Sequence, residues 1–148
     1  MYRFEDAYHF ETEGYHVGDK LNGNGSLRSF SKKITATNQM LDEEFNGYTN
    51  IVIYRTVGKA PYFDIGKYSN PYPYQQECLV PLDTMRVKDV NKYSGSGMRD
   101  EIYDKYGVDL GEYQYSLDNV TVVDVEYDPK VSRVVDSHGR TISSENLI

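Results

Sequence analysis

Hydrophobic and polar positions alternate along several short stretches of the chain, a pattern typical of half-buried β-strands. In residues 2–5 the alternation puts Arg3 and Glu5 on one face. In residues 26–31 it puts Phe30 on one face, with Leu27, Ser29 and Ser31 on the other. Residues 51–57 are almost continuously apolar, which predicts a central strand. Further strands are predicted at 62–65, 75–81, 85–90, 120–127 and 131–135, with 85–90 as the hairpin partner of the strand before it.

Apolar residues at helical spacing predict two helices. One begins at Thr35 or Thr37 and runs through Phe45, and the other covers 98–106, with Ser96 as a candidate N-cap and Gly107 as its end. Residues 6–25 predict a short helix or an irregular segment followed by a loop. No linker is long enough to split the 148 residues, so we expect a single domain of the α+β class.

Composition narrows the functional classes. The net charge of −7 gives no overall basic footprint, so we expect neither direct nucleic-acid binding nor attraction to an anionic membrane. The single cysteine, Cys78, excludes an internal disulfide, and we expect it to be buried. There is neither a signal peptide nor an apolar stretch of the roughly 20 residues that a membrane helix needs, which predicts a cytoplasmic protein. The three histidines lack the spacing of metal ligands, so no metal site is expected.

The sharpest candidate chemistry lies at Gln75 and Glu77, just after an aromatic, proline-punctuated loop at 68–74. Because side chains alternate along a strand, Gln75 and Glu77 share one face and Cys78 lies on the other. Such a pair on its own is more typical of an edge strand with a solvated glutamate. Its interest comes from polar residues that precede it in the chain.

The polar groups follow one another in a recognisable order. They are Arg3 in the first strand, Ser29 and Ser31 in a Ser-Phe-Ser stretch, and Gln75 with Glu77 before Leu-Val-Pro. Across residues 2–90 this series resembles the ADP-ribosyltransferase family, in its toxin-like arginine-serine-glutamate branch. The resemblance implies two small packed β-sheets with flanking helices around an NAD cleft. It also implies transfer of ADP-ribose from NAD, the co-substrate, to a side chain of a target protein.

The resemblance assigns a role to each residue. Glu77 would stabilise the oxocarbenium-like ribose and bind its 2′-hydroxyl. Arg3, or less readily Arg28, would hold the diphosphate bidentately. Ser29 would orient Glu77 and touch the ribose, and Ser31 would support that edge. The nicotinamide needs a flat ring, for which four aromatic residues compete: Phe45, Tyr54, Tyr72 and Tyr74.

Two features refine the expected activity. Members of the family that modify arginine carry a glutamate where this chain has Gln75. Because a neutral amide cannot deprotonate an acceptor, Gln75 indicates a non-arginine acceptor such as asparagine or glutamine. The first strand has no histidine to match the His-Tyr-Glu branch, which disfavours poly-ADP-ribose synthesis. A small enzyme without a delivery module suits a phage or effector protein that inactivates a host or defence complex.

Other interpretations stay open. Arg3 could pair with Glu5 in an ordinary ion pair, the two serines could be edge hydroxyls, and the tyrosines could anchor loops. The protein could hydrolyse NAD without an acceptor. It could also be a non-catalytic inhibitor that mimics charge through acidic clusters such as residues 42–44. The sequence predicts neither the oligomeric state nor a role for residues 94–148.

Overall fold

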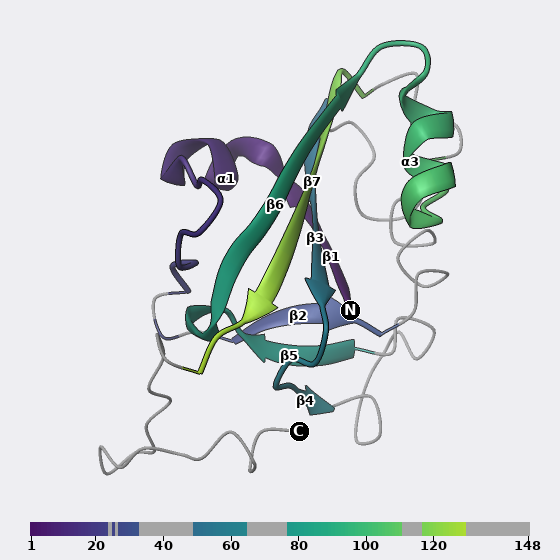
Figure 1. The fold of residues 1–148 in the computed structure, drawn as a ribbon. Coiled ribbons are helices and arrows are strands. Elements are labelled where there is room, and N and C mark those ends of the chain that lie inside the picture. The colour runs from purple at the N-terminus through teal and green to yellow at the C-terminus, as the bar shows by residue number, and fades with distance from the viewer. Residues whose placement is uncertain (24, 26, 33–48, 65–76, 111–116, 130–148) are drawn as a thin grey trace, which may run out of the picture.

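The computed structural model describes residues 1–23, 25, 27–32, 49–64, 77–110 and 117–129. These residues form one seven-stranded mixed sheet, in the order β4-β5-β2-β1-β3-β7-β6, and two α-helices (Figure 1). In chain order the elements are β1 (Tyr2–Asp6), α1 (Ala7–Glu13), β2 (Leu27–Ser31), β3 (Asn50–Val57), β4 (Phe63–Asp64), β5 (Glu77–Pro81), the 3₁₀ turn η2 (Leu82–Thr84), β6 (Met85–Ser94), α3 (Met98–Tyr106) and β7 (Asn119–Tyr127). The α+β class expected from the sequence is confirmed.

The sheet changes direction between β1 and β2. β1 pairs with β3 along its whole length, but with β2 only at Tyr2 and Ser31. β2 in turn pairs along its whole length with β5. As a result β2, β5 and β4 run across the direction of β1, β3, β7 and β6 (Figure 1). The prediction of two separate packed sheets is therefore wrong, because this single pair joins the two groups of strands into one sheet.

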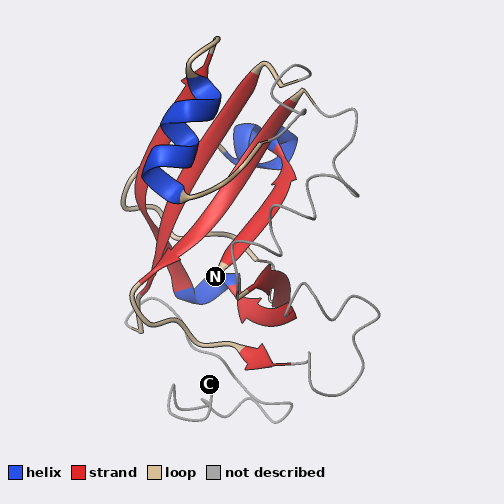
Figure 2. Cartoon of the chain, turned by 90° about the vertical axis from the view of Figure 1, so that its right-hand side faces the viewer, coloured by secondary structure: helices blue, strands red, loops and turns tan. Residues whose placement is uncertain are grey.

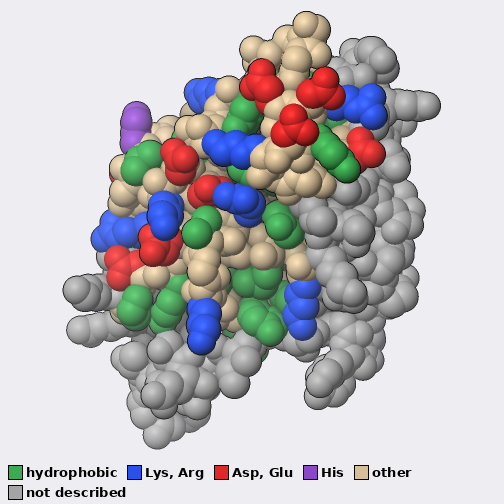
Figure 3. Space-filling model, turned by 45° about the vertical axis from the view of Figure 1, so that its right-hand side comes forward, with side chains coloured by type: hydrophobic (Ala, Val, Ile, Leu, Met, Phe, Trp, Pro, Cys, Tyr) green, Lys and Arg blue, Asp and Glu red, His purple; other side chains and the backbone are tan. Residues whose placement is uncertain are grey.

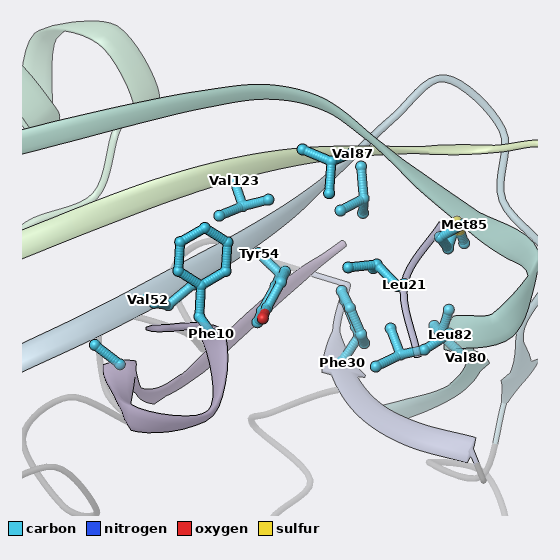
Figure 4. Close-up of a cluster of buried hydrophobic side chains, with 12 residues drawn as sticks. Phe10, Leu21, Phe30, Val52, Tyr54, Val80, Leu82, Met85, Val87 and Val123 are labelled. Carbon is cyan, nitrogen blue, oxygen red and sulfur yellow. The ribbon is translucent and has the colours of Figure 1, made fainter. Parts of the chain in front are cut away.

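Each face of the sheet buries its own hydrophobic core. On one face lies α3 (Figure 2), whose Met98, Ile102 and Tyr106 belong to the same buried cluster as apolar residues of β1, β3 and β7. On the other face, Phe10 of α1 joins Phe30 and other apolar side chains from β2, β3, β5, β6 and β7 (Figure 4). Full burial of one such large apolar side chain is worth roughly 1.5–3 kcal/mol. The two cores therefore fix β3 between them, and β1 contributes Phe4 to one of them.

Several predicted elements are confirmed, and one predicted helix cap is wrong. Residues 51–57 belong to β3, which lies between β1 and β7 as expected for a central strand. α3 ends before Gly107, whose φ of 73° suits a residue without a side chain. The predicted cap Ser96 is wrong, because Gly97 occupies the N-cap position. The helix expected at 35–45 and the strand expected at 131–135 lie outside the described residues.

The predicted hairpin between residues 75–81 and 85–90 is also wrong. η2 separates the two strands, and β6 pairs with β7 instead. The turn is held locally, because Thr84 Oγ1 donates to the carbonyl oxygen of Pro81 at 2.6 Å. The carboxylate of Asp83 accepts from the backbone N–H groups of Gly23 and Gly25, each at 2.7 Å. These bonds tie η2 to the loop before β2 and turn the chain away from β5.

Candidate functional site

Three of the sequence motifs meet in one row of paired residues. The backbone of Ser31 pairs with Tyr2 on one side and with Glu77 on the other. Neighbouring strands lie about 4.8 Å apart, so the start of β1, the end of β2 and the start of β5 are adjacent. Residues far apart in the sequence are thus gathered at the bend of the sheet.

Arg3 bridges the point where β1 and β2 diverge. Its Nη1 donates to the carbonyl oxygen of Ser29 at 3.1 Å, and its Nε donates to Glu5 Oε2 at 3.2 Å. The ion pair is partly buried, with 24% and 19% of the two side chains exposed. The pairing of Arg3 with Glu5 that the sequence left open is therefore confirmed. Because both contacts restrain the guanidinium, Arg3 is held close to the backbone of the Ser-Phe-Ser stretch.

Alternation along β2 separates its polar side chains. Phe30 is 1% exposed and belongs to the core that contains Tyr54, and Arg28 lies on the same face of the strand. Arg3 pairs across β1 and β3 with Tyr54, which puts Arg3 on this face as well. Ser29 and Ser31 lie on the opposite face of β2, where Ser31 is also buried. The structure thus groups Arg3 with Arg28 and Tyr54, and only the backbone of β2 links them to the serines.

A polar cavity of about 230 Å³ lies on the Arg3 face. Its lining residues come from β1, α1, the following loop, β2, β3 and η2: Arg3, Glu5, His9, Tyr15, Leu21, Arg28, Tyr54 and Leu82. Glu5 Oε1 is fully buried and has no hydrogen-bond partner among the described residues. His9 Nδ1 lies 3.8 Å from this oxygen. The β1–β2 cavity, as we call this space, therefore holds a carboxylate oxygen that the protein leaves unsatisfied.

Tyr54 stands at the boundary between this cavity and the core. It is 2% exposed and contacts the ring of Phe10 edge to face, with ring centroids 6.5 Å apart. Burial raises the pKa of Tyr54, and the nearby charge of Glu5 raises it further. The ring therefore has little free surface against which a nicotinamide could stack, and its hydroxyl stays protonated.

The raised pKa of Tyr54 predicts a loss of stability in alkali. The unfolded chain releases the phenolic proton near the ordinary pKa of about 10, whereas the folded chain retains it. The free energy of unfolding should therefore fall as the pH rises above about 10. In Tyr54→Phe this fall should be shallower, as measured by urea unfolding at a series of alkaline pH values. An equally steep fall of the unfolding free energy in both proteins would show that Tyr54 does not cause it.

The other predicted site residues are described only in part. Phe45, Tyr72, Tyr74 and Gln75 lie outside the described residues. Glu77 begins β5, and its backbone pairing is described, but its side chain is not. Cys78 is fully buried, as the sequence predicted. The residue that would bind the acceptor side chain and the aromatic ring that would stack on the nicotinamide therefore stay predictions.

The sequence did not single out the remaining walls of the cavity. His9 and Tyr15 come from α1 and the loop after it, and Leu82 comes from η2. Only Glu5 carried a signal, because its alternation with Arg3 placed both on one face. The other contacts depend on how α1 packs on the sheet. Local sequence patterns do not report such packing.

No protein-family model, curated protein or solved structure matches the chain. The strand pairing and the cavity therefore carry the functional inference. Within the part of the chain that the structure describes, no group of three or more histidine, cysteine or acidic side chains is arranged to hold a metal ion. Neither described helix has the length and apolar character needed to cross a membrane.

A second hollow, of about 450 Å³, lies between α1 and β6. Phe10 and Tyr15 line one side of it, and Val90 and Lys92 of β6 line the other. None of the described residues of the motif series borders this hollow. We therefore place the candidate site at the bend between β1, β2 and β5.

Proposed function

We propose that the protein is a mono-ADP-ribosyltransferase that moves ADP-ribose from NAD to a side chain of a target protein. The observation that supports this most strongly is the row Tyr2, Ser31 and Glu77, paired across three adjacent strands. Through this row β1, which carries Arg3, lies next to β2 with its Ser-Phe-Ser stretch. β2 in turn lies next to β5, which begins with Glu77. A ligand at the bend would lie beside all three strands, with Arg3 on one face of β2 and Ser29 and Ser31 on the other.

In the proposed reaction the bond between ribose C1′ and the nicotinamide nitrogen breaks. The bonding electron pair leaves with nicotinamide, which becomes neutral, and positive charge develops on the ribose. Glu77 would stabilise that charge. The acceptor atom of the target then bonds to C1′ and releases a proton. Because Gln75 is neutral, an amide side chain of asparagine or glutamine is the acceptor we favour.

Arg3 would bind the diphosphate of NAD. Its Nε and Nη1 are held by Glu5 and by the backbone of Ser29, while Nη2 has no hydrogen bond to any described residue. Charge-assisted hydrogen bonds from a guanidinium to phosphate are among the strong ones in proteins. β1 and β2 pair only at Tyr2 and Ser31 and diverge beyond that pair. No continuous row of strand pairing therefore lies between Arg3 and the side of β2 that carries its serines. This location supports a role for Arg3 beyond its ion pair.

Labelled NAD provides the test. The wild-type protein is incubated with NAD labelled in the adenylate half and with a cell lysate, and labelled proteins are resolved on a gel. We expect a labelled band that is absent with Glu77→Ala. Release of free ADP-ribose without lysate would indicate hydrolysis of NAD instead. Equal labelling by both proteins, or labelling by neither, would exclude transfer.

Charge mimicry is the second candidate function, and one observation favours it. α3 exposes three acidic residues, Asp100, Glu101 and Asp104. However, Arg99 and Lys105 flank them on the same helix, and basic side chains lie among the acidic ones on this side of the molecule (Figure 3). An inhibitor of this kind would act without NAD and would lose affinity steeply with added salt.

A further inference from the structure

We propose that the β1–β2 cavity is a binding site for a small hydroxylated anion, such as a sugar phosphate. The site consists of Arg28, Glu5 and the apolar walls around them, and its occupation does not depend on transfer of ADP-ribose. Three properties of the cavity lead to this ligand class. They are its charge, an unsatisfied acceptor, and its size.

The charge of the cavity favours an anion. Arg3 is neutralised by Glu5, which accepts from its Nε at 3.2 Å. Arg28 makes neither an ion pair nor a hydrogen bond with the residues that the structure describes, although it lines the same cavity. The walls therefore carry one positive charge in excess even when His9 is neutral. A guanidinium satisfies its donors best with the paired oxygens of a phosphate or a carboxylate.

The unsatisfied acceptor favours a hydroxyl group on the same ligand. Glu5 Oε2 accepts from Arg3, but Oε1 is buried and receives no hydrogen bond of ordinary length from the described residues. His9 Nδ1, at 3.8 Å, is too far to donate to it. A buried charged acceptor without a donor is costly, so a ligand that donates to Oε1 gains affinity. An ammonium group could also donate, but a zwitterion has no net charge and would leave the excess positive charge of the cavity uncompensated.

The size of the cavity sets an upper limit on the ligand. At about 230 Å³ it is smaller than the roughly 300–1,000 Å³ of pockets for drug-sized ligands. Leu21 and Leu82 supply apolar wall, and Tyr15 and Tyr54 supply rings with polar edges. Such walls suit the carbon skeleton of one monosaccharide. Its phosphate would meet Arg28, and a hydroxyl would meet Glu5.

Titrations followed by NMR amide shifts test the proposal, with ribose 5-phosphate, ribose and inorganic phosphate as probes. Ribose 5-phosphate should bind saturably and more tightly than either of the other two. Arg28→Gln should weaken its binding about tenfold or more, because a charge-assisted contact is lost. Glu5→Gln should weaken the binding of ribose 5-phosphate relative to that of inorganic phosphate, because phosphate alone does not need Oε1 and gains from the charge of Arg3 that Glu5 no longer neutralises. Arg99→Gln and Glu101→Gln on α3 are the matched controls and should bind normally.

Three results would overturn the proposal. The first is the absence of saturable binding of ribose 5-phosphate at millimolar concentration. The second is equal binding of ribose 5-phosphate by wild type and Arg28→Gln. The third is binding of inorganic phosphate as tight as that of the sugar phosphate. Circular dichroism would show that each variant is folded. Glu77→Gln should bind ribose 5-phosphate like wild type, so failure of transfer and failure of this site are distinguishable. Competition by NAD would show that the sugar phosphate belongs to the dinucleotide, and its absence would indicate a free metabolite.

Discussion

Replacing Glu77 with glutamine is expected to lower the rate of ADP-ribose transfer by on the order of 100-fold or more. Glutamine keeps the size of the side chain and can still accept a hydrogen bond, but it has no negative charge. The substitution therefore removes the stabilisation of the positive charge that develops on the ribose. The KM for NAD should change much less than kcat, because the charge is absent from the ground state of the ribose. Single-turnover incorporation of labelled NAD measures the two effects separately.

Glu101→Gln is the matched control, because it makes the same chemical change at an exposed position on α3. It should transfer ADP-ribose at the wild-type rate. Glu77→Gln should have the same far-UV circular dichroism as wild type, since β5 is held by its pairing with β2 and β4. Retention of full activity in folded Glu77→Gln would remove Glu77 from the mechanism.

Replacing Phe30 with alanine is expected to lower the free energy of unfolding by about 3–5 kcal/mol. Phe30 is 1% exposed and packs in the core formed by α1 and the β2 face of the sheet (Figure 4). Its removal deletes a large buried apolar surface and leaves a cavity that the surrounding strands fill only in part. Because Phe30 lies between Ser29 and Ser31, the loss also loosens the strand that links Arg3 to Glu77. Urea unfolding followed by circular dichroism measures the change.

Phe63→Ala provides the comparison for Phe30→Ala. Phe63 lies on the two-residue edge strand β4 and is 38% exposed, so its loss should cost much less. Equal destabilisation by the two substitutions would show that the core around Phe30 does not hold β2 in place.

The strands that could be predicted from the sequence are those whose pattern is set locally. Alternation in residues 26–31 predicted β2, and it placed Phe30 on the face opposite Ser29 and Ser31. The apolar run at 51–57 predicted β3, because a strand covered on both faces needs apolar residues on both. Gly107 marked the end of α3 because a left-handed residue is required there.

The pairing partners of the strands could not be predicted in the same way. The short connection between β5 and β6 suggested a hairpin, but Asp83 and Thr84 form bonds that redirect the chain, and β6 pairs with β7 instead. The bend at Tyr2 and Ser31 depends on how the two cores pack, and no local pattern specifies it. The expectation of two packed sheets came from the family resemblance, and the strand pairing replaces it with one continuous sheet.

The site was predictable only where its residues lie on strands whose side chains alternate between two faces. Arg3 and Glu5 were placed on one face from the sequence, and the structure brings them into an ion pair. The contact from Arg3 to the backbone of Ser29 depends on the divergence of β1 and β2, which the sequence does not report. The same divergence brings Arg28 into the cavity that Arg3 lines.

A crystal structure of the protein soaked with NAD tests the central claim most directly. The account predicts one NAD molecule at the bend of the sheet, with Arg3 on its diphosphate and with Ser29 and Glu77 on the nicotinamide ribose. NAD bound away from β1, β2 and β5, or in contact with only one of these three residues, would contradict it.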